Sequence, residues 1–213
     1  MPLLTTTAEV HWSGSRQDQQ ALAQRADWSQ ISRIDQLWPV LAERHRDAIA
    51  VEAPHASPPE RFSYRELSDR IDLAAAALGA LGLQPGEVVA LFAENGPRWL
   101  IADQAIMRCG AGNAVRGATA PLDELRYILD DAGAVGLVVE SAALLERLEL
   151  SVDQLQRLRF VLVLQDGPLA SSRALLSWGD LLERGTSAPA PTPTAPAGLA
   201  TILYTSGTTG QPK

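Results

Sequence analysis

The stretch VVALFAENGPRWLIADQAIMRCGA, residues 88–111, decides the fold class of this chain. It begins with a short, wholly apolar run, 88–93, which is typical of a strand buried on both faces of a sheet. After a polar turn, Pro97 stands where a helix can begin without losing a hydrogen bond, and apolar residues then recur at helical spacing. A buried strand followed directly by an amphipathic helix predicts an α/β unit with parallel strands.

The same alternation extends outward on both sides of this unit. Ser63 and Glu66 form a capping-box pattern, which predicts the start of a helix that reaches about Gly82. Downstream, apolar strands are expected at 134–140 and 159–164, with helices between and after them. The predicted fold class is therefore α/β, with a mostly parallel sheet that is covered by helices on both faces.

Composition divides the chain into four parts. Residues 1–30 are polar and irregular and are expected to form an N-terminal arm, whereas residues 31–185 carry the α/β pattern. Residues 186–198, TSAPAPTPTAPAG, place four prolines among small residues, which predicts a stiff and solvated linker. Residues 199–213 are then predicted to form a strand followed by a polar, glycine-rich loop.

The bulk composition argues against several classes of protein. The formal net charge is −7, whereas a nucleic-acid surface needs clustered Lys and Arg. The most apolar run, residues 73–83, is too short to span a bilayer, and the N-terminus lacks a signal-peptide pattern. Cys109 is the single cysteine and ends an apolar run, so we expect a buried thiol in a reducing compartment. We expect a cytoplasmic protein, and the sequence leaves a peripheral membrane contact open.

The stretch LATILYTSGTTGQPK, residues 199–213, carries the clearest functional signal. Its glycine-rich turn allows backbone N–H groups to point together into a concavity, and such concavities bind phosphate oxygens. The loop also supplies hydroxyl donors and one positive charge, from Ser206, Thr208, Thr209 and Lys213. Its spacing differs from the Walker A loop, because only two residues separate Gly207 from Gly210. We therefore interpret it as a phosphate-binding loop of a different build.

The segment YTSGTTGQPK (204–213) resembles the signature phosphate loop of the adenylate-forming superfamily: acyl-CoA synthetases, luciferases and the adenylation domains of peptide synthetases. Residues 62–111 are similar to the N-terminal half of these enzymes nearly throughout. AENGPRWLIAD (93–103) is closer to the long-chain fatty acid branch. Where most long-chain enzymes carry a proline-rich stretch, NAVRGATAP (113–121) instead resembles the acyl-acyl carrier protein synthetases. The resemblance covers about residues 31–213, and it implies an incomplete N-terminal part of the large domain, a fragment cut inside its phosphate loop.

The resemblance implies an acid–thiol ligase that activates a long-chain fatty acid with ATP and Mg²⁺ through acyl-AMP. The acyl group then passes to a thiol, either on CoA or on an acyl carrier protein. The resemblance assigns no catalytic residue within this stretch and no metal site built from protein side chains alone, so these residues alone are expected to be inactive. The resemblance implies contacts with the β- and γ-phosphates for Ser206, Gly207, Thr208, Thr209 and Gly210. By the same resemblance, Thr205 could bind Mg²⁺ or a phosphate, and Lys213 would support the loop or the phosphates.

Some alternatives stay open on the sequence alone. The chain could be a non-catalytic module. Such a module could bind a nucleotide, or it could pack against a partner protein that carries the rest of the fold. The acid could be an aryl or amino acid, because the acyl pocket of the family lies mostly outside this stretch. Arg116 could contact an anionic ligand or a carrier protein, or it could form a structural salt bridge. Tyr204 is expected to be a packing residue that sets the exit of its strand.

Overall fold

The structure, a computed structural model, describes residues 28–29, 31–56, 59–169, 175–191 and 198–205. The chain divides into two compact units, Met1–Ser32 and Arg33–Lys213. Most of the first unit, and with it most of the predicted arm, lies outside the described residues. The second unit contains all the helices and strands that the structure describes.

The second unit is an α/β structure, as the sequence predicts. Its strands in the described part of the chain are β1 (Ile49–Ala53), β2 (Glu60–Ser63), β3 (Val88–Phe92), β4 (Gly112–Arg116), β5 (Gly136–Val139), β6 (Phe160–Val163), β7 (Leu175–Ser177) and β8 (Thr201–Leu203). Its helices there are the 3₁₀ helix η1 (Ile34–Gln36), α2 (Leu37–His45), α3 (Tyr64–Ala80), α4 (Pro97–Arg108), α5 (Leu122–Asp131), α6 (Ala142–Arg147), α7 (Val152–Arg157) and α8 (Trp178–Ser187).

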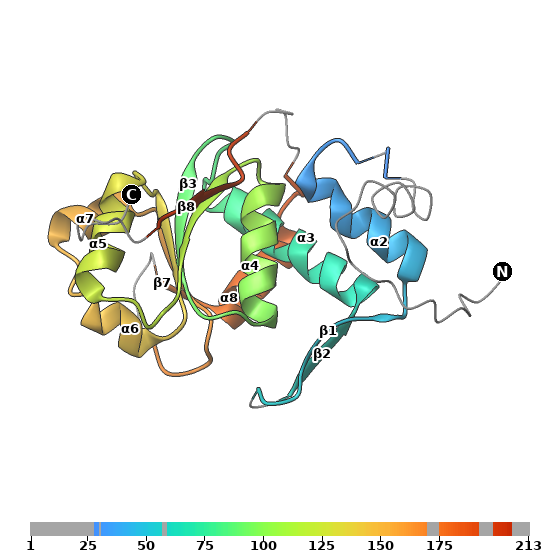
Figure 1. The fold of residues 1–213 in the computed structure, drawn as a ribbon, viewed down its shortest axis with the longest axis horizontal. Coiled ribbons are helices and arrows are strands. Elements are labelled where there is room, and N and C mark those ends of the chain that lie inside the picture. The colour runs from blue at the N-terminus through green and yellow to red at the C-terminus, as the bar shows by residue number, and fades with distance from the viewer. Residues whose placement is uncertain (1–27, 30, 57–58, 170–174, 192–197, 206–213) are drawn as a thin grey trace, which may run out of the picture. The chain divides into compact units, whose positions relative to one another are not determined.

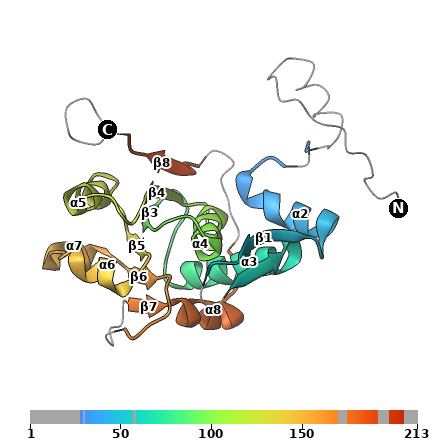
Figure 2. The ribbon, with the colours of Figure 1, turned by 60° about the horizontal axis from the view of Figure 1, so that its bottom comes forward.

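The central feature is a parallel sheet whose described strands run in the order β7-β6-β5-β3-β4-β8 (Figure 2). All the pairings in this sheet that the structure describes are parallel, while β1 and β2 form a separate antiparallel hairpin. The chain steps from β3 to β4 on one side and then crosses to β5 on the other side of β3. This reversal makes a switch point between β3 and β5. Ligands of open parallel sheets bind at such a point, outside the carboxyl ends of the strands.

Helices cover both faces of the sheet, with α3, α4 and α8 on one face and α5, α6 and α7 on the other (Figure 1). Alternate residues of β3 enter the two cores. Val89 and Leu91 pack in the cluster under α3, α4 and α8, whereas Ala90 and Phe92 pack in the cluster under α5 and α6. Because both sides of β3 are buried, apolar residues occupy its whole length.

The face that each helix covers follows the direction in which the chain moves across the sheet. The connections through α4 and α8 step toward β4 and β8, and both helices lie on one face. The connections through α5 and through α6 with α7 step the opposite way, and these helices lie on the other face. A single handedness of crossover produces this pattern.

Two of the sequence predictions can be checked closely in α3 and α4. Ser63 Oγ accepts a hydrogen bond from the Glu66 N–H at 3.2 Å, and Glu66 Oε2 accepts one from the Ser63 N–H at 2.8 Å. The predicted capping box therefore starts α3. Cys109, at the end of α4, is buried with Sγ 3.3 Å from the Ala75 carbonyl oxygen, and this burial raises the pKa of its thiol to about 12.

Three elements of the structure were not predicted from the sequence, namely β2, α7 and β7. β2 carries Glu60 and Arg61 and pairs only with β1 among the described strands, so it lacks the apolar run of a buried strand. β7 is only three residues long, too short to show a period. α7 exposes Val152 and Leu155 to solvent, so its apolar residues do not mark a buried face. None of the helices that the structure describes is long and apolar enough to cross a membrane.

Candidate functional site

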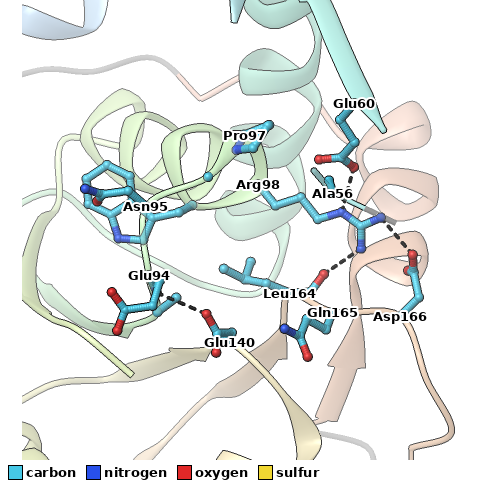
Figure 3. Close-up of a pocket in the computed structure, with 13 residues that line it drawn as sticks. Ala56, Glu60, Glu94, Asn95, Pro97, Arg98, Glu140, Leu164, Gln165 and Asp166 are labelled. Carbon is cyan, nitrogen blue, oxygen red and sulfur yellow. Dashed lines mark hydrogen bonds and ion pairs between the residues drawn. The ribbon is translucent and has the colours of Figure 1, made fainter. Parts of the chain in front are cut away.

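A crevice of about 450 Å³ lies at the switch point, beyond the carboxyl ends of β3, β5 and β6. The segments that directly follow these three strands line it, together with residues of the β1–β2 hairpin (Figure 3). Its charged lining residues are Glu60, Glu94, Arg98, Glu140 and Asp166. The crevice therefore occupies the place where an open parallel sheet binds its ligand.

Arg98, in the first turn of α4, connects three segments of the chain at one end of this crevice. Its Nε donates to Glu60 Oε1 at 3.0 Å, its Nη1 to the Leu164 carbonyl oxygen at 2.6 Å, and its Nη2 to Asp166 Oδ2 at 2.7 Å (Figure 3). The hydrogen bond with Asp166 is the largest cause that raises the pKa of Arg98, and the same bond lowers the pKa of Asp166. The guanidinium thus ties the start of α4 to β2 and to the segment after β6.

Glu94, two residues beyond Phe92 at the end of β3, holds the segments at the other end of the crevice together. Its backbone N–H donates to Glu140 Oε1 at 3.2 Å, as Figure 3 shows. Its Oε1 accepts hydrogen bonds from the Thr119 N–H at 3.3 Å and from the Thr119 hydroxyl at 3.2 Å. Glu94 therefore links the ends of β3 and β5 to the turn that follows β4.

The strand β8 leads toward the same edge of the sheet. It pairs in parallel with β4, with Leu203 opposite Val115, so the two strands end side by side. Tyr204 follows β8 and is buried, and its hydroxyl donates to Asp131 Oδ2 at 2.8 Å. Burial is the largest cause that raises the pKa of the Tyr204 hydroxyl. Tyr204 is thus a packing residue at the strand exit, as the sequence predicts.

The remaining predicted residues divide into described and undescribed ones. Thr205 is exposed and directly follows Tyr204 at the carboxyl edge. Outside the described residues lie Ser206, Gly207, Thr208, Thr209, Gly210 and Lys213. Arg116 forms the salt bridge that was one of its two expected roles, with Nε 2.7 Å from Glu124 Oε1.

Sequence reasoning missed the crevice residues Glu94, Arg98 and Glu140. A signal for two of them was present, because Glu94 directly follows the predicted strand 88–93 and Glu140 ends the predicted strand 134–140. Polar residues at the carboxyl ends of parallel strands are candidates for a binding site. The strand order decides which of these ends meet, and the order could not be read from the sequence.

Comparison with known proteins identifies the family and the fold of this chain. Residues 40–213 match the family model described as AMP-binding enzyme. Long-chain-fatty-acid–[acyl-carrier-protein] ligase AEE15, chloroplastic, of Arabidopsis thaliana is 31% identical over 202 residues, which are 87% of this chain and 28% of that protein. Salicyl-AMP ligase / salicyl-S-ArCP synthetase of Mycobacterium tuberculosis is 37% identical over 181 residues, which are 81% of this chain and 30% of that protein.

Among solved structures, the inhibitor-bound N-terminal domain of FACL13 from Mycobacterium tuberculosis has a TM-score of 0.67 and 24% sequence identity. The match covers 86% of this chain and 43% of that one, and it shows the same fold. The chain spans less than a third of the length of the two curated relatives, at 28% and 30%.

Proposed function

We propose, from the premise that this chain belongs to the AMP-binding enzyme family, that it supplies the phosphate-binding part of an acid–thiol ligase. In the complete protein this ligase joins a carboxylic acid to AMP from ATP and then passes the acyl group to a thiol. The thiol belongs to CoA or to an acyl carrier protein. One observation carries the proposal: the segment YTSGTTGQPK begins where β8 ends, at the carboxyl edge of a parallel sheet.

The donor set of this loop fits a polyphosphate. Its residues offer hydroxyl groups, backbone N–H groups and one ammonium group, and the stretch 205–213 contains no carboxylate. The proposed contacts with the β- and γ-phosphates come from Thr205, Ser206, Gly207, Thr208, Thr209, Gly210 and Lys213. A Mg²⁺ ion held by the phosphates, with Thr205 as a further oxygen ligand, would neutralise part of their charge.

Lys213 has a distinctive place in the composition. It is the only lysine of the sequence, whose other basic side chains are all arginine apart from three histidines. A lysine is a compact point charge and is commonly used against phosphates. The position of this single lysine at the end of the glycine-rich motif supports a phosphate-binding role for Lys213.

The physical task of the loop is to stabilise the negative charge on the phosphates during the reaction. The attacking carboxylate and the polyphosphate are both anionic, and the departing pyrophosphate gains further negative charge. Donors that are already oriented toward the β- and γ-oxygens stabilise that charge as it develops, without reorganising during the reaction. Removing one such donor from an enzyme typically lowers the rate by about 10²–10³.

For the acid, we propose a long-chain fatty acid first. The supporting features are AENGPRWLIAD at 93–103, the VRG at 115–117, and the similarity to the Arabidopsis long-chain ligase. An aryl acid is the second candidate, because the salicyl-AMP ligase is 37% identical to this chain. An amino acid is a third candidate, since the described residues do not include a closed acyl pocket.

Carboxylate-dependent exchange between ATP and pyrophosphate tests the proposal. The protein expressed from its complete gene is assayed with palmitate, with salicylate and with a mixture of amino acids. Exchange with palmitate that falls about 10²–10³ in Lys213→Ala would support the proposal. Exchange only with salicylate or an amino acid would replace the substrate, and no exchange with any acid would contradict the ligase assignment. Residues 1–213 alone should show no exchange, since they span less than a third of the curated relatives.

A further inference from the structure

The face of the sheet that α5, α6 and α7 cover also carries an apolar groove of about 510 Å³. It lies where α6 and α7 pack beside β6 and β7 (Figure 2). The apolar side chains that line it come from these four elements and from the turn between the two helices: Leu145, Leu150, Val152, Leu155, Val161 and Leu175. The groove shares no lining residue with the crevice beyond β3, so nothing about it depends on the ligase assignment.

The mouth of the groove exposes apolar surface to water. Val152 is 68% exposed and Leu155 is 47% exposed, and both belong to α7. Leu145 and Leu150, which pack against the core on this face, are only partly buried. Single exposed apolar residues are common on protein surfaces, but several of them around one cavity are typical of an interaction site.

Glu149, which also lines the groove, has a backbone conformation that is unfavourable for any residue with a side chain. Its φ is +44°, in the left-handed region, and it is the second residue after α6. The same position after α3, α4 and α5 is in each case a glycine with positive φ: Gly82, Gly110 and Gly133. Glycine ends a helix in this way without steric cost. The fold therefore does not explain a glutamate after α6.

The carboxylates at the rim of the groove have no counter-charge in the described part of the chain. Glu146 and Glu149 are both exposed, and among the described residues their side chains form no hydrogen bond or ion pair. Asp130 of α5, by contrast, accepts hydrogen bonds from Gln154 and Arg157 of α7. The groove thus combines an apolar floor with two unpaired negative charges at its rim.

We propose that this groove binds an amphipathic helix of a partner protein, in which Lys or Arg residues flank a row of apolar side chains. Apolar side chains at positions i, i+3 and i+7 of that helix enter the groove. The flanking cations pair with Glu146 and Glu149, which gives the glutamate at position 149 a use that glycine cannot supply. The same rim repels an acidic protein and an anionic lipid surface, so its charge selects the basic partner.

The experiment uses the protein expressed from its complete gene and a synthetic helical peptide of leucine and lysine, about 18 residues long, with the leucines on one face. Fluorescence anisotropy measures the Kd of the peptide, and amide hydrogen exchange shows which residues it protects. We expect protection of residues 142–157 and weaker binding as the NaCl concentration rises. A matched peptide with glutamate in place of every lysine should bind at least about tenfold more weakly.

Glu149→Gly separates the two effects of this glutamate. It relieves the left-handed conformation, so amide hydrogen exchange in α6 of the free protein should become slower. It also removes one charge from the rim, so the peptide should bind about threefold more weakly. A purely structural role of Glu149 would not produce these two opposite changes.

Leu155→Gln tests the apolar floor, because it keeps a residue that favours helix and removes an apolar contact. The peptide should bind about tenfold more weakly to this variant. Glu183→Gln is the matched control for charge, since Glu183 is an exposed carboxylate of α8, on the other face of the sheet (Figure 1). It should leave the Kd of the peptide unchanged.

Several results would overturn the inference. Equal binding of the lysine and glutamate peptides would remove the role of the rim, and an unchanged Kd in Leu155→Gln would place the peptide elsewhere. Faster hydrogen exchange in α6 of Glu149→Gly would show that the carboxylate serves the fold. If light scattering showed a dimer that Leu155→Gln dissociates, a second copy of the chain would occupy the groove instead. Absence of any peptide binding would also contradict the proposal.

Discussion

Tyr204, the residue after β8, donates its hydroxyl to Asp131 at the end of α5 across 2.8 Å. The same carboxylate accepts a hydrogen bond from the Tyr127 hydroxyl at 3.3 Å, and the two rings lie edge to face. The exposed carboxylate of Asp131 thus accepts hydrogen bonds from two tyrosines, one in α5 and one at the exit of β8. The strand β8, which leads into the phosphate loop, is therefore held by the hydrogen bond of Tyr204 as well as by its pairing with β4.

Replacing Tyr204 with Phe should lower the free energy of unfolding by about 1 kcal/mol, because the ring still packs and only the hydrogen bond is lost. The pKa of the Tyr204 hydroxyl is raised, so its contribution is complete below the ordinary tyrosine pKa of about 10. That contribution falls as the pH rises further, so the difference between the two proteins should shrink above about pH 10. Urea unfolding at pH 7 and above pH 10 measures it. A pH-independent difference would contradict the assignment.

The contact between α3 and α8 should be sensitive to a single methyl group. A Cβ at Gly185 would lie 2.1 Å from the Leu73 carbonyl oxygen, so Gly185→Ala must push two backbones apart. We expect a loss of about 2–3 kcal/mol in the free energy of unfolding. Gly179→Ala, in the same helix, is the matched control. Its Cβ would lie 3.8 Å from Ser177 Oγ, and alanine favours helix, so it should stabilise by up to about 1 kcal/mol. Equal effects of both substitutions would refute the close approach.

Arg98→Ala should destabilise the crevice end of the fold. It removes three charge-assisted hydrogen bonds and leaves Glu60, whose side chain is 17% exposed, without its cation. We expect a loss of about 2–3 kcal/mol, measured by urea unfolding. Arg65→Ala is the comparison, because the Arg65 side chain is 54% exposed and its carboxylate partner is 3.9 Å away. That change should cost less than about 0.5 kcal/mol. A similar small cost for Arg98→Ala would show that the three bonds are weak.

A buried carboxyl group at Asp103 should make stability depend on pH. Asp103 accepts hydrogen bonds from Gln104 Nε2 at 2.7 Å and from Asn113 Nδ2 at 2.5 Å, and its burial raises the pKa of the carboxyl. The folded state therefore favours the protonated form. Its stabilisation is complete below the ordinary aspartate pKa, about 3.9, and is lost as the pH rises through the folded-state value.

The variant Asp103→Asn cannot titrate at this position. The free energy of unfolding of the variant, minus that of the wild-type protein, should therefore rise between about pH 4 and pH 7. Other titrating groups are common to both proteins and cancel in this difference. Guanidinium unfolding at several pH values measures it, and a flat difference would mean that folding does not raise the pKa of Asp103.

The parallel sheet could be predicted because burial on both faces leaves a direct mark on the sequence. β3 is apolar throughout its length, and the capping box of Ser63 and Glu66 gives the start of α3. β2 left no such mark, since Glu60 and Arg61 belong to a hairpin outside the main sheet. The sequence indicates short edge elements poorly, because their stability comes from neighbours that are far away in the chain.

The candidate site also contains residues that the sequence predicts and residues that it does not. The phosphate loop is a contiguous motif, so its residues could be named from the sequence, and their contacts with ATP stay a prediction. Glu94, Glu140 and Asp166 follow three different strands. Only the strand order brings these three positions to one crevice, and that order is a property of the whole sheet.

The position of β8 also has a consequence for the order of folding. Each strand from β3 to β7 pairs with a strand that lies nearer in the sequence, whereas the chain must cross from β7, at one edge of the sheet, over β6, β5, β3 and β4 before β8 pairs with the outer side of β4. Closing so large a loop costs chain entropy that is recovered only when the strand pairs, so β8 should join the sheet after the other strands. Substitutions in β8 should then raise the unfolding rate and leave the folding rate nearly unchanged. The segment that carries the phosphate motif would be the last of this sheet to form and the first to detach.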